Sequence, residues 1–157
     1  MFPPDFFATL QARYALGKIY QSHRLEGGEW KTLLRIDCDR GAFVVSVSHP
    51  SAVREGVAYE HAFLRYLNAR LPQIAAPLVA QDESTYFFVN GRIVTLFPFM
   101  PGVIADRDQM RLPAARFLAQ YHQAALDYPN RAARPGIPAW WGLDWDANYA
   151  WHWPTVW

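Results

Sequence analysis

The chain has 157 residues, of which 52% are apolar and 18% are charged. This balance excludes an intrinsically disordered chain and leaves enough apolar surface for a compact core. The formal net charge is only +1, which argues against a general nucleic-acid or anionic-membrane binder. No basic and apolar leader opens the chain, and no run reaches the roughly 18 apolar residues of a membrane span. A soluble, cytoplasmic protein is therefore expected.

The titratable residues favour neither a disulfide nor a metal site. Cys38 is the single cysteine, so an intrachain disulfide and a multi-cysteine zinc site are excluded. The five histidines show no HxxxH or HExxH spacing. We therefore expect no metal ligands in this chain.

The first third of the chain predicts a helix followed by an antiparallel meander. Residues 4–14 carry apolar side chains at helical spacing. Three β-type runs separated by turns rich in Gly or Asp follow it: residues 16–25, 30–36 and 42–47.

A long helix is predicted over residues 51–71, with Ser51 as its N-cap and Pro72 as its stop. Its inward stripe comprises Val53, Val57, Glu60, Leu64, Leu67 and Leu71. Glu60 is the exception in this apolar stripe. An unpaired buried carboxylate is costly, so Glu60 either meets a cation or lies at the edge of the stripe and reaches water.

The following segment predicts further strands, a hinge and a second helix. A weak strand is expected at 76–80, and a hairpin joins 85–89 to 92–97 through Asn90-Gly91. Residues 98–102, with two prolines, form a stiff connector. The second helix begins at about Asp108 or Leu112 and ends at Leu126, with Pro113 tolerated near its first turn.

Six of the seven tryptophans lie in the last eighteen residues. Clustered tryptophans can stack on sugar rings or insert into a partner's groove. The favoured interpretation is that they pack on the remainder of a second lobe. The isolated chain is then expected to self-associate through this Trp-rich tail.

Five stretches, taken in order, resemble the amino-terminal lobe of the aminoglycoside phosphotransferase and homoserine kinase family, which has a protein-kinase-like fold. They are 25–28 (LEGG), 41–45 (GAFVV), 59–64 (YEHAFL), 96–102 (LFPFMPG) and 117–122 (FLAQYH). The resemblance implies an α+β fold: an antiparallel sheet of about five strands with one long packed helix, then a hinge and the first helix of a truncated second lobe. The implied organisation is an N-terminal lobe at 1–97, a hinge at 98–102 and the start of a second lobe at 103–157.

The resemblance also implies a cleft that binds ATP and, in the intact family protein, Mg²⁺. Glycine amides would approach the phosphates, Glu60 would pair with a strand lysine or arginine, and the hinge backbone would bind adenine. The implied cofactor-binding residues are Gly27, Gly28, Glu60, Phe99, Met100 and Gly102. No catalytic residue is expected in this chain.

Two departures from the family pattern are visible. Ser46 stands where the family has its strand lysine or arginine, so Glu60 is expected to lose its usual partner, with Arg35 or Lys18 as substitutes. The family's His-Gly-Asp catalytic loop, with an Asn five residues after the Asp, is absent, as is its later metal-binding Asp. We therefore expect the chain alone to be inactive.

The leading functional hypothesis is an ATP-dependent phosphotransferase for the hydroxyl of a small molecule, represented here by its amino-terminal part. Its partners would be a nucleotide and a small-molecule acceptor, whose identity the sequence does not reveal. One alternative is a non-catalytic, pseudokinase-like module that binds a nucleotide or a partner, for which Ser46 is the supporting feature. Another is a ligand-binding protein, unrelated to kinases, that uses its tryptophans.

Overall fold

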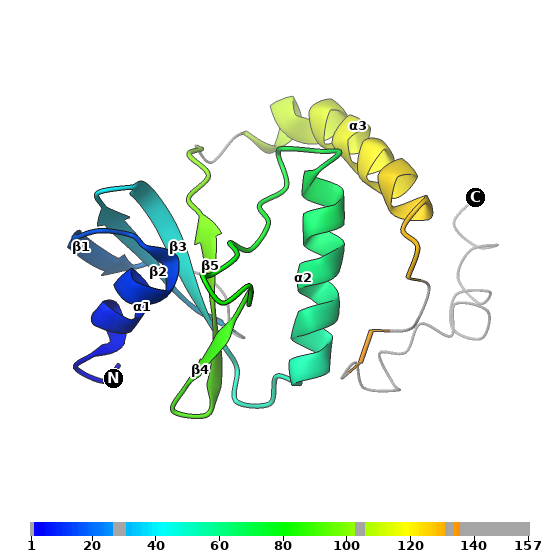
Figure 1. Ribbon diagram of the computed structural model, residues 1–157. Coiled ribbons are helices and arrows are strands. Elements are labelled where there is room, and N and C mark those ends of the chain that lie inside the picture. The colour runs from blue at the N-terminus through cyan, green and yellow to red at the C-terminus, as the bar shows by residue number, and fades with distance from the viewer. Residues whose placement is uncertain (1, 27–30, 103–105, 131–133, 136–157) are drawn as a thin grey trace.

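The computed structural model describes residues 2–26, 31–102, 106–130 and 134–135. Its five strands form one antiparallel sheet in the order β1-β2-β3-β5-β4 (Figure 1). The α+β architecture expected from the sequence is confirmed. In chain order the elements are α1 (Phe6–Tyr14), β1 (Ile19–Arg24), β2 (Lys31–Cys38), β3 (Gly41–Ser48), α2 (Arg54–Asn68), β4 (Phe87–Val89), β5 (Arg92–Pro98) and α3 (Arg107–Leu126).

Two tight turns fix the register of the sheet. Cys38 pairs with Gly41, so two residues connect β2 to β3. Asn90 and Gly91 connect β4 to β5 with φ values of 49° and 73°. Positive φ at both central residues matches the right-handed twist of the strands, which explains why the Asn-Gly pair predicted this hairpin correctly.

Helices cover both faces of the sheet. α1 lies on one face, where Phe6 and Leu10 join a buried apolar cluster with Ile36, Val45 and Leu96. Figure 1 shows α2 on the side of the sheet away from α1. Because side chains alternate along a strand, the residues between these core positions face α2.

The predicted N-cap of α2 and the predicted strand at 76–80 were wrong. α2 begins at Arg54 with Val53 as its N-cap residue, and no side chain caps it. Ser51 instead closes a local turn in which its backbone N–H and its hydroxyl bond His49 Nδ1. Residues 76–80 form no strand; the Leu78 N–H donates to the Leu96 carbonyl, and this segment runs beside β5 without a ladder.

The inward stripe of α2 also differs from the prediction. Val53 is 42% exposed, whereas His61 is 4% exposed. The N-cap is Val53 instead of Ser51, two residues later than expected, which leaves Val53 outside the helix. The buried residues of α2 are Gly56, Val57, His61 and Leu67.

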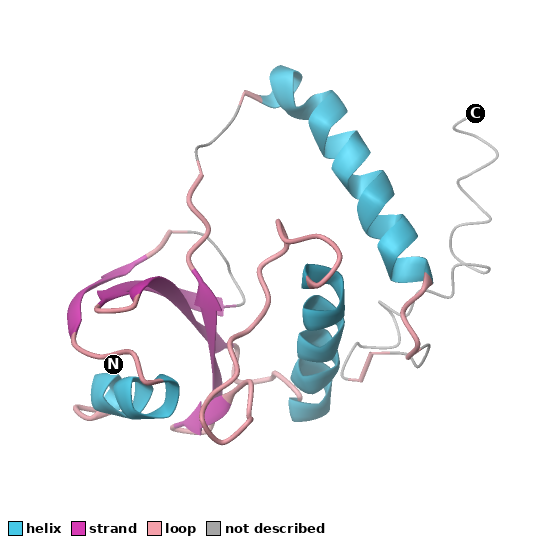
Figure 2. Cartoon of the chain, turned by 45° about the horizontal axis from the view of Figure 1, so that its top comes forward, coloured by secondary structure: helices cyan, strands magenta, loops and turns pink. Residues whose placement is uncertain are grey.

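α3 follows the predicted hinge, residues 98–102, and packs against α2 through aromatic rings. The Phe63 and Tyr121 rings are 6.2 Å apart, and the ring of buried Tyr128 lies 4.9 Å from that of Phe63. Asp106 caps α3 by accepting hydrogen bonds from the N–H groups of residues 108 and 109. Pro113 therefore lies inside the helix, beyond its first turn. Figure 2 shows α3 reaching past the sheet, beside α2.

Candidate functional site

Glu60 is the centre of an ionic cluster on α2. Lys31 Nζ, at the start of β2, lies 3.2 Å from Glu60 Oε1. Arg134 Nη2 lies 2.6 Å from Glu60 Oε2. The side chains of Glu60, Lys31 and Arg134 are 28%, 45% and 42% exposed. Ion pairs this exposed each contribute at most about 1 kcal/mol of stability. The main effect of the cluster is therefore to orient the charged groups of these three side chains, and its contribution to the stability of the fold is small.

As expected, Ser46 gives Glu60 no cationic partner, and a cation from elsewhere replaces the usual one. Of the two interpretations of Glu60, the structure supports the one in which it meets a cation. Lys31 is opposite Ser48, and Leu33 is opposite Ser46, in the β2–β3 register. Lys31 therefore lies on the same face of the sheet as Ser46, one strand across and two residues along. The cation comes from a neighbouring strand because Ser46 cannot supply it.

Neither substitute suggested by the sequence pairs with Glu60. Arg35 donates two hydrogen bonds to Asp37, and its guanidinium lies 4.2 Å from the centre of the Phe99 ring. The backbone N–H of Lys18 bonds the Asp39 carboxylate, and the Lys18 ammonium lies over the Tyr20 ring. Arg35 thus interacts at the end of the sheet near Phe99, and Lys18 interacts at the start of β1.

His61, next to Glu60 on α2, anchors the helix to the sheet. Its Nδ1 lies 2.8 Å from Thr85 Oγ1, and its Nε2 lies 3.3 Å from Thr95 Oγ1. Burial lowers the pKa of His61 from 6.5 to about 4, the charge of Glu60 opposes this shift, and that of Lys31 adds to it. A neutral imidazole with both nitrogens bonded fixes the rotation of α2 and, with it, the position of Glu60.

The hinge backbone has fewer free donors than the sequence suggested. The Phe99 N–H donates to the Ala42 carbonyl at 3.1 Å and so extends the pairing of β3 with β5. Pro98 and Pro101 have no N–H. Met100 and Gly102 are exposed, and their N–H groups are the donors left among the three that were expected to bind adenine.

Gly27 and Gly28 lie outside the described residues, as does the Trp-rich tail. Their predicted roles stay predictions. Within the described ranges, no group of three or more His, Cys, Asp or Glu side chains is arranged to hold a metal ion. None of the helices described is long and apolar enough to cross a membrane.

Arg134 and Pro135 bring a distant part of the chain against α2. Arg134 Nε donates to the Gly56 carbonyl at 3.4 Å, in addition to pairing with Glu60. A Cβ at Gly56 would overlap the carbonyl oxygen of Pro135, so this close approach requires glycine. The sequence offered no signal for Arg134. Lys31, by contrast, could have been found by testing the same face of the neighbouring strand.

A five-stranded antiparallel sheet, with one long helix whose glutamate is paired to a strand lysine, defines a kinase-like amino-terminal lobe. Residues 24–155 match the phosphotransferase enzyme family (APH), and the chain belongs to this family.

The chain is similar to a curated protein and to a solved structure. A homoserine kinase of Rhodopseudomonas palustris (strain HaA2) is 25% identical over 133 residues, which are 83% of this chain and 41% of the kinase. The crystal structure of a spectinomycin phosphotransferase in complex with ADP and spectinomycin is similar in fold, with a TM-score of 0.53 and 12% identity. That match covers 63% of this chain and 30% of the other. The chain therefore spans less than half the length of either protein.

Proposed function

We propose that the chain forms the nucleotide-binding part of an ATP-dependent phosphotransferase that acts on a hydroxyl of a small molecule. The proposed organisation is a lobe at 1–97, a hinge at 98–102 and the beginning of a second lobe at 103–157. The observation that carries the proposal is the ion pair between Glu60 and Lys31. A lysine held by a helix carboxylate is the group that contacts the α- and β-phosphates in kinase-like enzymes.

Each part of the proposed site has a defined task. Lys31 neutralises phosphate charge, and Glu60 holds its ammonium toward the cleft. Met100 and Gly102 offer backbone N–H groups to adenine, while Gly27 and Gly28 cover the phosphates with theirs. Homoserine and spectinomycin, which the names of the two relatives give as their substrates, both carry hydroxyl groups. This supports a small-molecule hydroxyl as the acceptor. Mg²⁺ would accompany the nucleotide, bound by residues that this sequence does not contain.

The test is ATP binding by the purified chain, measured by isothermal titration calorimetry with and without Mg²⁺. Lys31→Met should weaken binding about tenfold, the lower end of the range for a lost charged hydrogen bond. Lys18→Met is the matched control, because it removes the same charge at the start of β1, and it should bind ATP like the parent chain. No ATP binding by the parent chain, or equal effects of the two variants, would contradict the proposed site.

Phosphoryl transfer is a separate expectation. The family's catalytic loop is absent from the sequence, so the chain alone should not turn over ATP, and measurable turnover would contradict our assignment of roles. The alternative, a non-catalytic nucleotide- or partner-binding module, has Ser46 as its supporting feature. Sequencing the gene beyond the codon for Trp157 separates the two: a His-x-Asp-x-x-x-x-Asn loop supports the phosphotransferase, and an immediate stop codon supports the module.

A further inference from the structure

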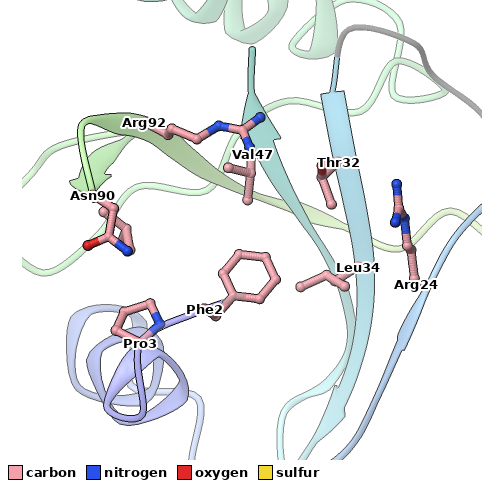
Figure 3. Close-up of a pocket in the computed structure, with 9 residues that line it drawn as sticks. Phe2, Pro3, Arg24, Thr32, Leu34, Val47, Asn90 and Arg92 are labelled. Carbon is pink, nitrogen blue, oxygen red and sulfur yellow. The ribbon is translucent and has the colours of Figure 1, made fainter. Parts of the chain in front are cut away.

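A cavity of about 410 Å³ lies between the N-terminal segment and the sheet, on the face that α1 covers (Figure 3). Pockets for small molecules begin at about 300 Å³, so this volume admits a small organic ligand. The sheet contributes Thr32, Leu34 and Val47 to its wall. Phe2 and Pro3 close it from the side of α1.

The floor of the cavity is apolar and held in place. Leu34 and Val47 are 9% and 3% exposed and belong to the core. The Phe2 ring stacks on that of buried Phe6 with 4.3 Å between centroids, which fixes the Phe2 side chain. A ligand in this cavity gains from burying an apolar body against these three side chains.

The rim of the cavity is cationic. Arg24, at the end of β1, and Arg92, at the start of β5, lie on two sides of the opening, with Thr32 between them (Figure 3). Arg92 Nε donates to the Ser48 carbonyl at 2.7 Å, which orients its guanidinium and leaves its terminal nitrogens available. Asn90 adds an amide. In the described part of the chain, no Asp or Glu lines this cavity.

We propose that this cavity binds a small organic carboxylate with an apolar body. A guanidinium group matches the fork geometry of a carboxylate, and the rim offers two such groups, those of Arg24 and Arg92. A simple inorganic anion would satisfy the arginines and leave the apolar floor wet, whereas an uncharged apolar molecule would leave two cations without a counterion. The lining of the cavity therefore favours a ligand that combines a carboxylate with an apolar body in one molecule.

The cavity is distinct from the proposed nucleotide site. Thr32, Leu34 and Val47 point to the α1 face, whereas Lys31 and Ser46 belong to the α2 face, because alternate residues of a strand point in opposite directions. The thickness of the sheet separates the two sites. Carboxylate binding can therefore be tested independently of ATP binding.

The experiment uses octanoate as the probe, titrated into the ¹⁵N-labelled 157-residue chain and followed by NMR. Octanoate should shift the backbone amides of Thr32, Val89 and Asn90. Octanol has the same alkyl chain but no charge, and inorganic phosphate has a charge but no alkyl chain. Each should bind more weakly than octanoate. Octanol binding as tightly as octanoate, or shifts concentrated elsewhere, would overturn the proposal.

Variants test the assigned contacts. Arg24→Gln should weaken octanoate binding by up to about fivefold, as expected for one partly exposed charge pair. Arg116→Gln, an exposed residue of α3 away from the cavity, is the matched control and should leave the affinity unchanged. Phe2→Ala should weaken octanoate binding while leaving phosphate binding unaltered. If the parent chain and Arg24→Gln bound octanoate with equal affinity, the proposed contact between the carboxylate and the rim arginine would be refuted.

Discussion

The buried His61 makes a quantitative prediction about stability and pH. Its pKa falls from 6.5 to about 4 because burial between α2 and the sheet disfavours the imidazolium. The unfolded chain therefore binds a proton at His61 at a higher pH than the folded chain does. This contribution to stability is complete above pH 6.5, is lost as the pH falls from 6.5 to about 4, and changes no further below that.

The magnitude follows from the size of the shift. Each pKa unit corresponds to about 1.4 kcal/mol, so the full shift would be roughly 3 kcal/mol. Because local opening around the ring can admit water at a lower cost than global unfolding, we expect about 2 kcal/mol of this to be observed. As the pH falls from 6.5 to about 4, the protonation of His61 alone should lower the free energy of unfolding by about 2 kcal/mol. The titration of the carboxylates adds a separate change.

Urea denaturation at several pH values between 4 and 7.5 measures this effect. His61→Gln keeps an amide that can bond Thr85 and Thr95 but removes the titration, so its stability should fall less steeply with decreasing pH. The difference between the two curves should change by about 2 kcal/mol across this range. His23→Gln, an exposed position on β1, should parallel the parent chain. Parallel curves for His61→Gln and the parent would refute the reasoning.

Two further substitutions test local geometry through the free energy of unfolding. Ala in place of Gly normally stabilises a helix by about 0.5–1 kcal/mol, but Gly56→Ala should destabilise by about 1–3 kcal/mol, because a Cβ there meets the Pro135 carbonyl. Gly102→Ala, where a Cβ meets nothing within 4 Å, is its control. A Gly56→Ala variant more stable than the parent would show that the 134–135 segment contributes little. Gly91→Ala should cost about 1–2 kcal/mol, because its φ is +73° in otherwise open space. If Gly91→Ala had the same free energy of unfolding as the parent chain, the positive φ assigned to this turn would be contradicted.

Local sequence signals predicted most of the sheet. The Asn90-Gly91 turn fixes its own hairpin, since few other residue pairs adopt two consecutive positive φ values. The high content of β-branched residues in β3 likewise identified a strand. The start of α2 was misplaced because Ser51 found a nearer partner in His49, a competition that a capping rule does not weigh.

The sequence by itself determined the order of the elements and the tight hairpins, because each rests on chemistry within a few neighbouring residues. Tertiary structure alone decided which cations meet Glu60, since strand register places Lys31 beside it and chain folding brings Arg134 from 74 positions away. Tertiary structure alone also decided which N–H groups remain free in the predicted hinge, because the Phe99 N–H donates to the Ala42 carbonyl. The physical reason is that an ion pair or a hydrogen bond depends on distance in space, and residues remote along the chain carry no local sign of where folding will place them.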